Sequence, residues 1–318
     1  MDIEIKKAID YLNYNITLEH SAIIQYLFHA YTIKEEEIEA ELEEIAREEM
    51  KHLRMFAHAV VDLGGIPSID KRVSVFLEAP SPIELIQLNI DAEKMAIDEY
   101  GKQLKDISDK KVQRIIERAI NDETAHLHIF QKLQEKVKEH IANNGEASVI
   151  DENKMKIIQI LNKYLHKQYE KILESLYQSF MLRHKNPILS DEIEQRAIDK
   201  MKHFGWIAEE ITGMGAKPNV ELPKVEKVDD EAKAIEYHIK DQQEFSKEIQ
   251  EIASNVEDKD LKWILDRIAK REIHYTDLEE FLNKPDITDE EISKVISTLT
   301  VGSLFGKHKE RGGKQQLL

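Results

Sequence analysis

A seam of apolar residues at alternating steps of four and three most constrains what this chain can fold into. Across residues 3–34 the seam comprises Ile5, Ile9, Leu12, Ile16, Glu19, Ile23, Tyr26 and Ala30. A repeat of this period lies on one face of a helix and packs against other helices in a bundle. Similar seams run through 36–63, 82–107 and 109–140. The first half is therefore predicted to form four long helices.

The second half repeats this layout. Its four comparable stretches are 152–184, 190–213, 230–256 and 258–283. In each half one long connection, "GGIPSIDKRVSVFLEAPS" or "GMGAKPNVELPKVEKVDD", separates the second stretch from the third. Ser81 and Glu84 form a capping box around Pro82, which predicts the start of the third helix. The sequence predicts an all-α fold of two tandem four-helix bundles, each with a long crossover between its second and third helices.

The segment "ANNGEASVID", residues 142–151, is small and polar, which is typical of an interdomain linker. We expect one domain at 1–141, a second at 152–284, and a C-terminal helix and flexible tail at 285–318. Short strings recur between the halves: "YLNYN" with "ILNKY", "EMKH" with "KMKH", and "ERAINDE" with "DRIAKRE". These matches indicate an internal duplication.

Composition excludes several functions. The formal net charge of -17 argues against binding to nucleic acid or anionic membranes, and it suits a protein that handles cations. The absence of cysteine excludes disulfides, iron–sulfur clusters and thiolate metal centres. No apolar run is long enough to span a bilayer, and "MDIEIKKAID" does not have the pattern of a signal peptide. A cytoplasmic location is the expectation.

Ionisable residues interrupt the apolar seams near the middle of all four helices in the first half. They are Glu19, Glu49, His52, Glu93, Glu123 and His126. Each desolvated charge costs several kcal/mol, so such a cluster requires compensating positive charge. Two divalent cations would balance four glutamates. The Glu-x-x-His spacing puts both side chains on one helix face, where they can bind one metal ion together. Equal separations, from Glu19 to Glu49 and from Glu93 to Glu123, give the set a pseudo-two-fold character.

The segments "LNYNITLEHSAIIQY", "EEMKH" and "DETAH" resemble ferritin-like di-iron carboxylate proteins of the bacterioferritin and rubrerythrin type, over nearly all of residues 3–135. The resemblance implies that Glu19 and Glu93 are terminal ligands and that Glu49 and Glu123 bridge two iron ions. It also implies that His52 and His126 bind one iron ion each. The implied activity is that of a ferroxidase, which oxidises Fe(II) with O₂ or H₂O₂. A di-metal peroxidase, a manganese catalase, and a non-enzymatic iron-binding or structural bundle are the alternatives.

Two pairs of side chains beside these positions allow further interpretations. Tyr26 and Tyr100 each follow a lone glutamate by seven residues, and core filling is favoured over hydrogen bonding to a ligand or electron donation. Met50 stands where bacterioferritins carry a haem-ligating methionine, and Met201 is its counterpart in the second half. Haem is nevertheless not expected.

The second half has lost most of the ligand set. In the aligned seams Gln168 and Gln242 replace the lone glutamates, and Lys200 replaces Glu49. His203 and Glu272 are retained, whereas Tyr275 replaces the second histidine. A rival register turns Glu170 and Glu244 inward. It is disfavoured because the residues one turn away form a solvated pattern, namely His166, Glu174, Lys240 and Glu248.

We therefore expect an internal ion pair between Lys200 and Glu272 to take the place of metal. The second bundle is expected to pack on the first as an intramolecular pseudo-dimer partner. A single weak metal at His203 and Glu272 is the alternative.

The C-terminal segment "LTVGSLFGK", Leu299–Lys307, follows a short predicted helix capped by Thr288 with Glu291. It offers Leu299, Val301 and Leu304 as apolar anchors. It resembles the cargo-loading peptides that direct enzymes into encapsulin nanocompartments, which implies an encapsulin shell protein as partner. The alternative is a disordered tail, or a strand packed on the chain's own bundles.

Overall fold

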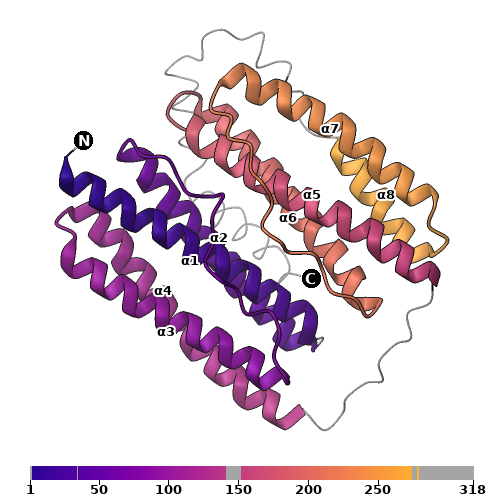
Figure 1. Cartoon of the computed structure of the whole chain (residues 1–318), viewed down its shortest axis with the longest axis horizontal. Helices are drawn as coiled ribbons and strands as arrows, with labels where there is room; N and C mark the ends of the chain where they lie inside the picture. The colour runs from indigo at the N-terminus through magenta and orange to yellow at the C-terminus, as the bar shows by residue number, and fades with distance from the viewer. Residues whose placement is uncertain (1, 34, 141–151, 274–277, 279–318) are drawn as a thin grey trace, which may run out of the picture.

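The computed structural model describes residues 2–33, 35–140, 152–273 and 278, without the side chains of 138–140 and 272–273. Within these residues the chain is all-helical and has no strand, as predicted, and it forms two tandem four-helix bundles (Figure 1). The helices are α1 (Ile3–Ile33), α2 (Glu36–Asp62), α3 (Pro82–Asp106), α4 (Lys110–His140), α5 (Glu152–Leu182), α6 (Pro187–Gly213), α7 (Glu231–Ser254) and α8 (Lys259–Ile273).

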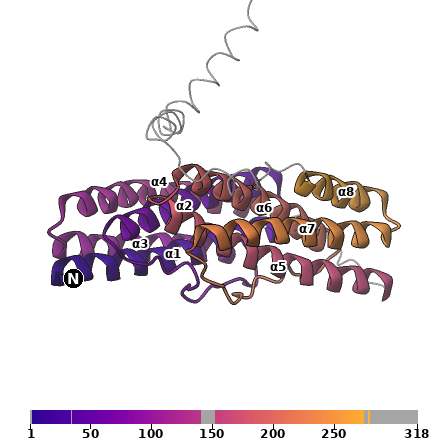
Figure 2. The same cartoon turned by 90° about the horizontal axis from the view of Figure 1, so that it is seen from above.

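Both bundles pack their helices in the same way. In the first, α1 pairs with α2 and α3 with α4, and the two hairpins meet through α1 with α3 and α2 with α4. In the second, α5–α8 repeat these pairings. The bundles lie side by side, with the α1/α2 and α5/α6 hairpins facing each other at the centre (Figures 1 and 2). Most residues of the predicted seams therefore face bundle interiors, although Ile5 at the start of the first seam is 38% exposed.

Most helix boundaries agree with those predicted from the sequence. Ser81 caps α3 by accepting from the backbone N–H of Glu84, and Pro82 is the first helical residue, as predicted. The start of α6 was predicted wrongly: the helix begins at Pro187 and not at 190. The Asn186 side chain accepts from the backbone N–H of Leu189, so an N-cap followed by proline starts the helix earlier.

The second helix of each bundle ends in the same way. Gly64, just after α2, has φ 77°, and Gly215, just after α6, has φ 87°. Only glycine adopts this left-handed conformation without steric cost. Each glycine therefore turns the chain into its long crossover.

The predicted linker 142–151 and the predicted C-terminal segment 285–318 both lie outside the described residues. The domain boundaries at 141, 152 and 284 therefore stay predictions. No described helix is long and apolar enough to cross a membrane.

The first crossover, which connects α2 to α3, is hydrogen-bonded to side chains of α1. Ser21 donates to the carbonyl of Val73 (3.1 Å), and the backbone N–H of Phe76 donates to Gln25 (2.9 Å). His29 lies within hydrogen-bonding distance of the Phe76 carbonyl (2.8 Å). These contacts fix one wall of the cavity described below.

Ion pairs join the two bundles. Arg54 contacts Glu194 (2.5 Å), Arg183 contacts Asp62 (2.9 Å), and Lys227 contacts Asp70 (2.8 Å). Buried apolar residues of both halves also form one continuous cluster. The second bundle thus packs tightly on the first.

Candidate metal centre

All six residues predicted as ligands lie in one cluster at the middle of the first bundle. Each is at most 3% exposed. They form two groups whose ligand atoms lie within 4.8 Å of one another: Glu19, Glu49, His52 and Glu123 in one, and Glu49, Glu93, Glu123 and His126 in the other. Glu49 and Glu123 belong to both groups. The geometry thus gives these two glutamates access to two neighbouring positions.

The two histidines point the same ring nitrogen inward. Nδ1 of His52 lies 2.9 Å from Oε2 of Glu49 and 3.1 Å from Oε1 of Glu123. Nδ1 of His126 lies 2.9 Å from Oε1 of Glu49 and 3.2 Å from Oε2 of Glu123. One ring N–H cannot donate well to two carboxylates, and Oε1 of each of these glutamates makes no hydrogen bond among the described residues. This buried set of oxygen and imidazole donors fits divalent metal ions.

Two tyrosines cross between the helices to hold the outer glutamates. The Tyr26 hydroxyl of α1 donates to Oε1 of Glu93 in α3 (2.8 Å), and Tyr100 of α3 donates to Oε1 of Glu19 in α1 (2.5 Å). Both tyrosines fill the core, as the sequence favoured, at 1% and 0% exposed, and their hydroxyls hydrogen-bond in addition. Each hydrogen-bonds to the glutamate of the opposite helix, a pairing that spacing along one helix cannot reveal.

Two further carboxylates orient the histidines from outside. Nε2 of His52 lies 3.1 Å from Asp122, and Nε2 of His126 lies 2.8 Å from Glu48. Such outer contacts fix the tautomer and orientation of metal-binding histidines. The sequence analysis missed both residues, although each directly precedes a cluster glutamate, in "EEMKH" and in "DETAH".

We predict that Glu48→Gln and Asp122→Asn each weaken metal binding by about 10–100-fold. The amides keep the size of the carboxylates but lose the charge that orients the rings. Metal titration followed by calorimetry would measure the change. Glu44→Gln is the matched control, because Glu44 is exposed and pairs with Arg47. Affinities equal to that of the control would show that the outer carboxylates do not position the histidines.

Burial and mutual repulsion set the pKa values of the cluster. Burial, followed by the charges of Glu123 and Glu49, raises the pKa of Glu19 and of Glu93. Burial alone would lower the pKa of His52, but Glu123 and Glu49 raise it to about 12. The same two glutamates raise the pKa of His126 to about 11 against the effect of burial. Protons on these groups therefore compensate the clustered carboxylates at neutral pH.

It follows that metal binding should release protons, since ligating imidazoles and carboxylates must be deprotonated. Because the pKa values of both histidines are raised, we expect metal affinity to rise with pH, by about tenfold per pH unit for each proton released. Calorimetry in two buffers of different ionisation enthalpy would count the protons. A pH-independent affinity without proton release would contradict this.

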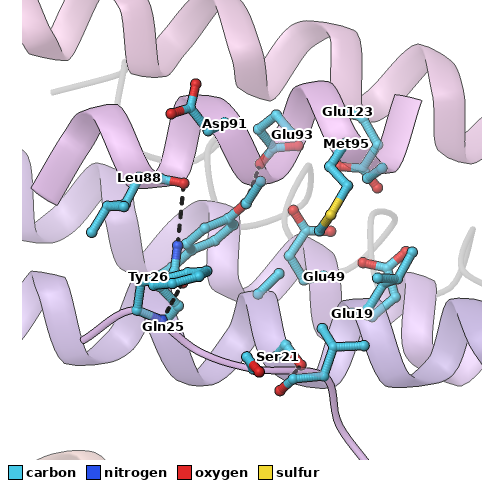
Figure 3. A pocket seen from close by; sticks show the side chains of 17 residues that line it. Glu19, Ser21, Gln25, Tyr26, Glu49, Leu88, Asp91, Glu93, Met95 and Glu123 are labelled. Atoms are coloured by element: carbon cyan, nitrogen blue, oxygen red, sulfur yellow. Dashed lines mark hydrogen bonds between the residues drawn. The ribbon is translucent and has the colours of Figure 1, made fainter. Parts of the chain in front are cut away.

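A cavity of about 310 Å³ connects this cluster to the protein surface. Four glutamates line its inner end, where Figure 3 shows Glu19, Glu49, Glu93 and Glu123 lying together. Its outer walls come from α1, α3 and the first crossover, and they include the exposed side chains of Asp91 and Met95. The cavity therefore offers a route from solvent to the carboxylates.

The second bundle buries a different polar set at the corresponding place. Gln168, Lys200 and His203 are all buried, as expected. Nζ of Lys200 lies 3.0 Å from Oδ2 of Asp241 and 4.3 Å from the centre of the Phe245 ring. The side chain of Glu272, the predicted partner of Lys200, lies outside the described residues, as does Tyr275. In the described part of α5–α8, no group of three metal-ligating side chains converges.

Two predictions for the second bundle were wrong, namely that Gln242 of α7 faces the interior and that Glu174 of α5 faces solvent. Asp241 is buried whereas Gln242 is only partly so, accepting from Arg196 (3.3 Å). Glu174, expected in solvent, is 2% exposed. Its carboxylate accepts hydrogen bonds from the backbone N–H of Glu226 (2.9 Å) and from the Tyr237 hydroxyl, and it forms an ion pair with Lys171 (2.8 Å).

The two methionines considered for haem, Met50 and Met201, are partly buried and pack on the apolar core. Their possible role in haem binding stays an untested interpretation.

The first bundle buries glutamates and histidines in two groups that could each hold a metal ion. This arrangement is typical of carboxylate-type metal-binding helical bundles. The family model described as Ferritin-like matches residues 12–104. Bacterioferritin from Desulfovibrio desulfuricans (strain ATCC 27774 / DSM 6949 / MB) is 32% identical over 146 residues, which are 44% of this chain and 79% of the bacterioferritin. The chain therefore belongs to the ferritin-like family. No solved structure matches it significantly.

Proposed function

We propose that the first bundle is a ferroxidase that takes two Fe(II) ions as substrate and oxidises them for iron storage or detoxification. The observation that carries the proposal is the sharing of Glu49 and Glu123 by both ligand groups. Bridging carboxylates hold two metal ions close enough for one oxidant molecule to receive an electron from each. With O₂ as oxidant, two electrons and two protons give H₂O₂. With H₂O₂, the same numbers give two molecules of water.

Each residue of the cluster has a distinct role in this proposal. Glu49 and Glu123 bridge the two iron positions, and Nδ1 of His52 or His126 completes one position each. Glu19 and Glu93 are terminal ligands, oriented by the hydroxyls of Tyr100 and Tyr26. Hard carboxylate oxygens favour Fe(III) over Fe(II), which makes oxidation favourable. The cavity supplies the entry route, and the acidic Asp91 at its outer wall attracts cations.

The test is anaerobic loading with Fe(II), followed by rapid mixing with air-saturated buffer. We expect about two iron ions per chain and ferric absorption in the near ultraviolet that forms much faster than in buffer alone. Elemental analysis of protein purified without chelators would identify the native metal. Tightly bound manganese with O₂ evolution from H₂O₂ would replace the ferroxidase by a catalase. Oxidation no faster than in buffer would leave a non-enzymatic binding protein.

We further propose that Leu299–Lys307 docks the chain inside an encapsulin shell, where the oxidised iron would be stored. The support is the sequence resemblance alone, since this segment lies outside the described residues. Co-expression with a cognate shell protein should load the full chain but not a chain truncated after Ser297. Equal co-purification of both forms with assembled shells would reject the proposal.

A further inference from the structure

A second group of carboxylates meets between the two bundles. Glu39 and Glu43 of α2 and Glu209 of α6 each place a carboxylate oxygen within 4.8 Å of the others. The ion pairs described above join opposite charges across this boundary, whereas here three like charges converge. Arg47 contacts Glu43 (2.7 Å) from the exposed side of α2, but it is shared with Glu44. Most of the negative charge is therefore left uncompensated by the described side chains.

A buried tyrosine points toward the same place. Tyr31 is 4% exposed, and among the described residues its hydroxyl makes no hydrogen bond. The hydroxyl reaches α6 at Gly205, where it would lie 3.1 Å from an added Cβ, one helical turn before Glu209. Burial raises the pKa of the Tyr31 phenol, and the charges of Glu43, Glu209 and Glu39 raise it further. A ligand held by this group would give the Tyr31 hydroxyl a hydrogen-bond partner.

We propose that Glu39, Glu43 and Glu209 bind a third divalent cation, which links the two bundles. The ligands are carboxylate oxygens only, so a hard cation such as Ca²⁺, Mg²⁺ or Mn²⁺ suits them. The Tyr31 hydroxyl donates a hydrogen bond to one of the carboxylates or to water on the ion. This site is separate from the histidine-containing cluster and does not depend on the proposed ferroxidase activity.

Calorimetric titration of the full chain with Ca²⁺ tests the site, because Ca²⁺ prefers oxygen ligands and disfavours the histidine cluster. We expect one Ca²⁺ per chain, at least tenfold weaker binding in Glu209→Gln and Glu43→Gln, and weaker binding in Tyr31→Phe. The matched controls are Glu210→Gln and Glu44→Gln, neighbours outside the group, which should bind like wild type. Glu49→Ala should also keep the site.

A second measurement separates the site from general surface acidity. A cation that binds only the folded protein raises the unfolding temperature. Ca²⁺ should therefore raise the Tm of wild type and of Glu210→Gln, but not that of Glu209→Gln. No Ca²⁺ binding by wild type, or equal losses in Glu209→Gln and Glu210→Gln, would overturn the proposal.

Discussion

Glu49→Ala should reduce bound metal from about two ions per chain to fewer than one. Glu49 belongs to both ligand groups, so its removal takes an oxygen ligand from each position at once. The rate of Fe(II) oxidation should fall by more than ~100-fold, which is the largest effect expected for Glu48→Gln or Asp122→Asn. Elemental analysis and stopped-flow absorption would measure both effects.

Glu44→Ala is the control for this experiment. It removes a carboxylate from the same helix, but one that is exposed and paired only with Arg47 among the described contacts. Metal content and oxidation rate should remain those of wild type. If Glu49→Ala still bound two ions, the shared-glutamate arrangement would not be the metal centre.

Lys200→Met should destabilise the protein by about 3–5 kcal/mol while leaving the metal content unchanged. The Lys200 ammonium is 2% exposed and lies against the buried Asp241 carboxylate. Methionine fills a similar volume but leaves the carboxylate buried without that cation. The free energy of unfolding from urea titration gives the magnitude.

Two comparisons make this prediction specific. Lys202→Met removes an exposed lysine that pairs with Asp199 on the same helix, and it should cost at most about 1 kcal/mol. Adding Asp241→Leu to Lys200→Met should recover much of the lost stability, because the unpaired carboxylate is gone. Equal costs for Lys200→Met and Lys202→Met would refute the buried ion pair.

The sequence predicted the helical frame and the grouping of the six cluster residues because both follow from one period. Residues at alternating steps of three and four share a helix face, and that face is the bundle interior. The paired Glu-x-x-His units therefore had to face inward beside Glu19 and Glu93. The structure brings all six together.

The residues that were misjudged depend on partners distant in the chain. Glu174 is buried because Tyr237 and the crossover at Glu226 satisfy its carboxylate, which no local pattern reveals. Asp241 and Gln242 are neighbours at the edge of the helix face, where periodicity alone does not decide which turns inward. The hydrogen bonds of Tyr26 and Tyr100 likewise required knowing which helix lies opposite.

The joining of both bundles in one chain has a consequence for their facing surfaces. In a two-fold homodimer each side chain at the interface occurs twice, so a change that suits one side is imposed on the other. Here α2 and α6 are encoded separately, so Glu49 and Lys200 occupy matching places with opposite charges. Each bundle can therefore change independently of the other, which the symmetry of a homodimer does not allow.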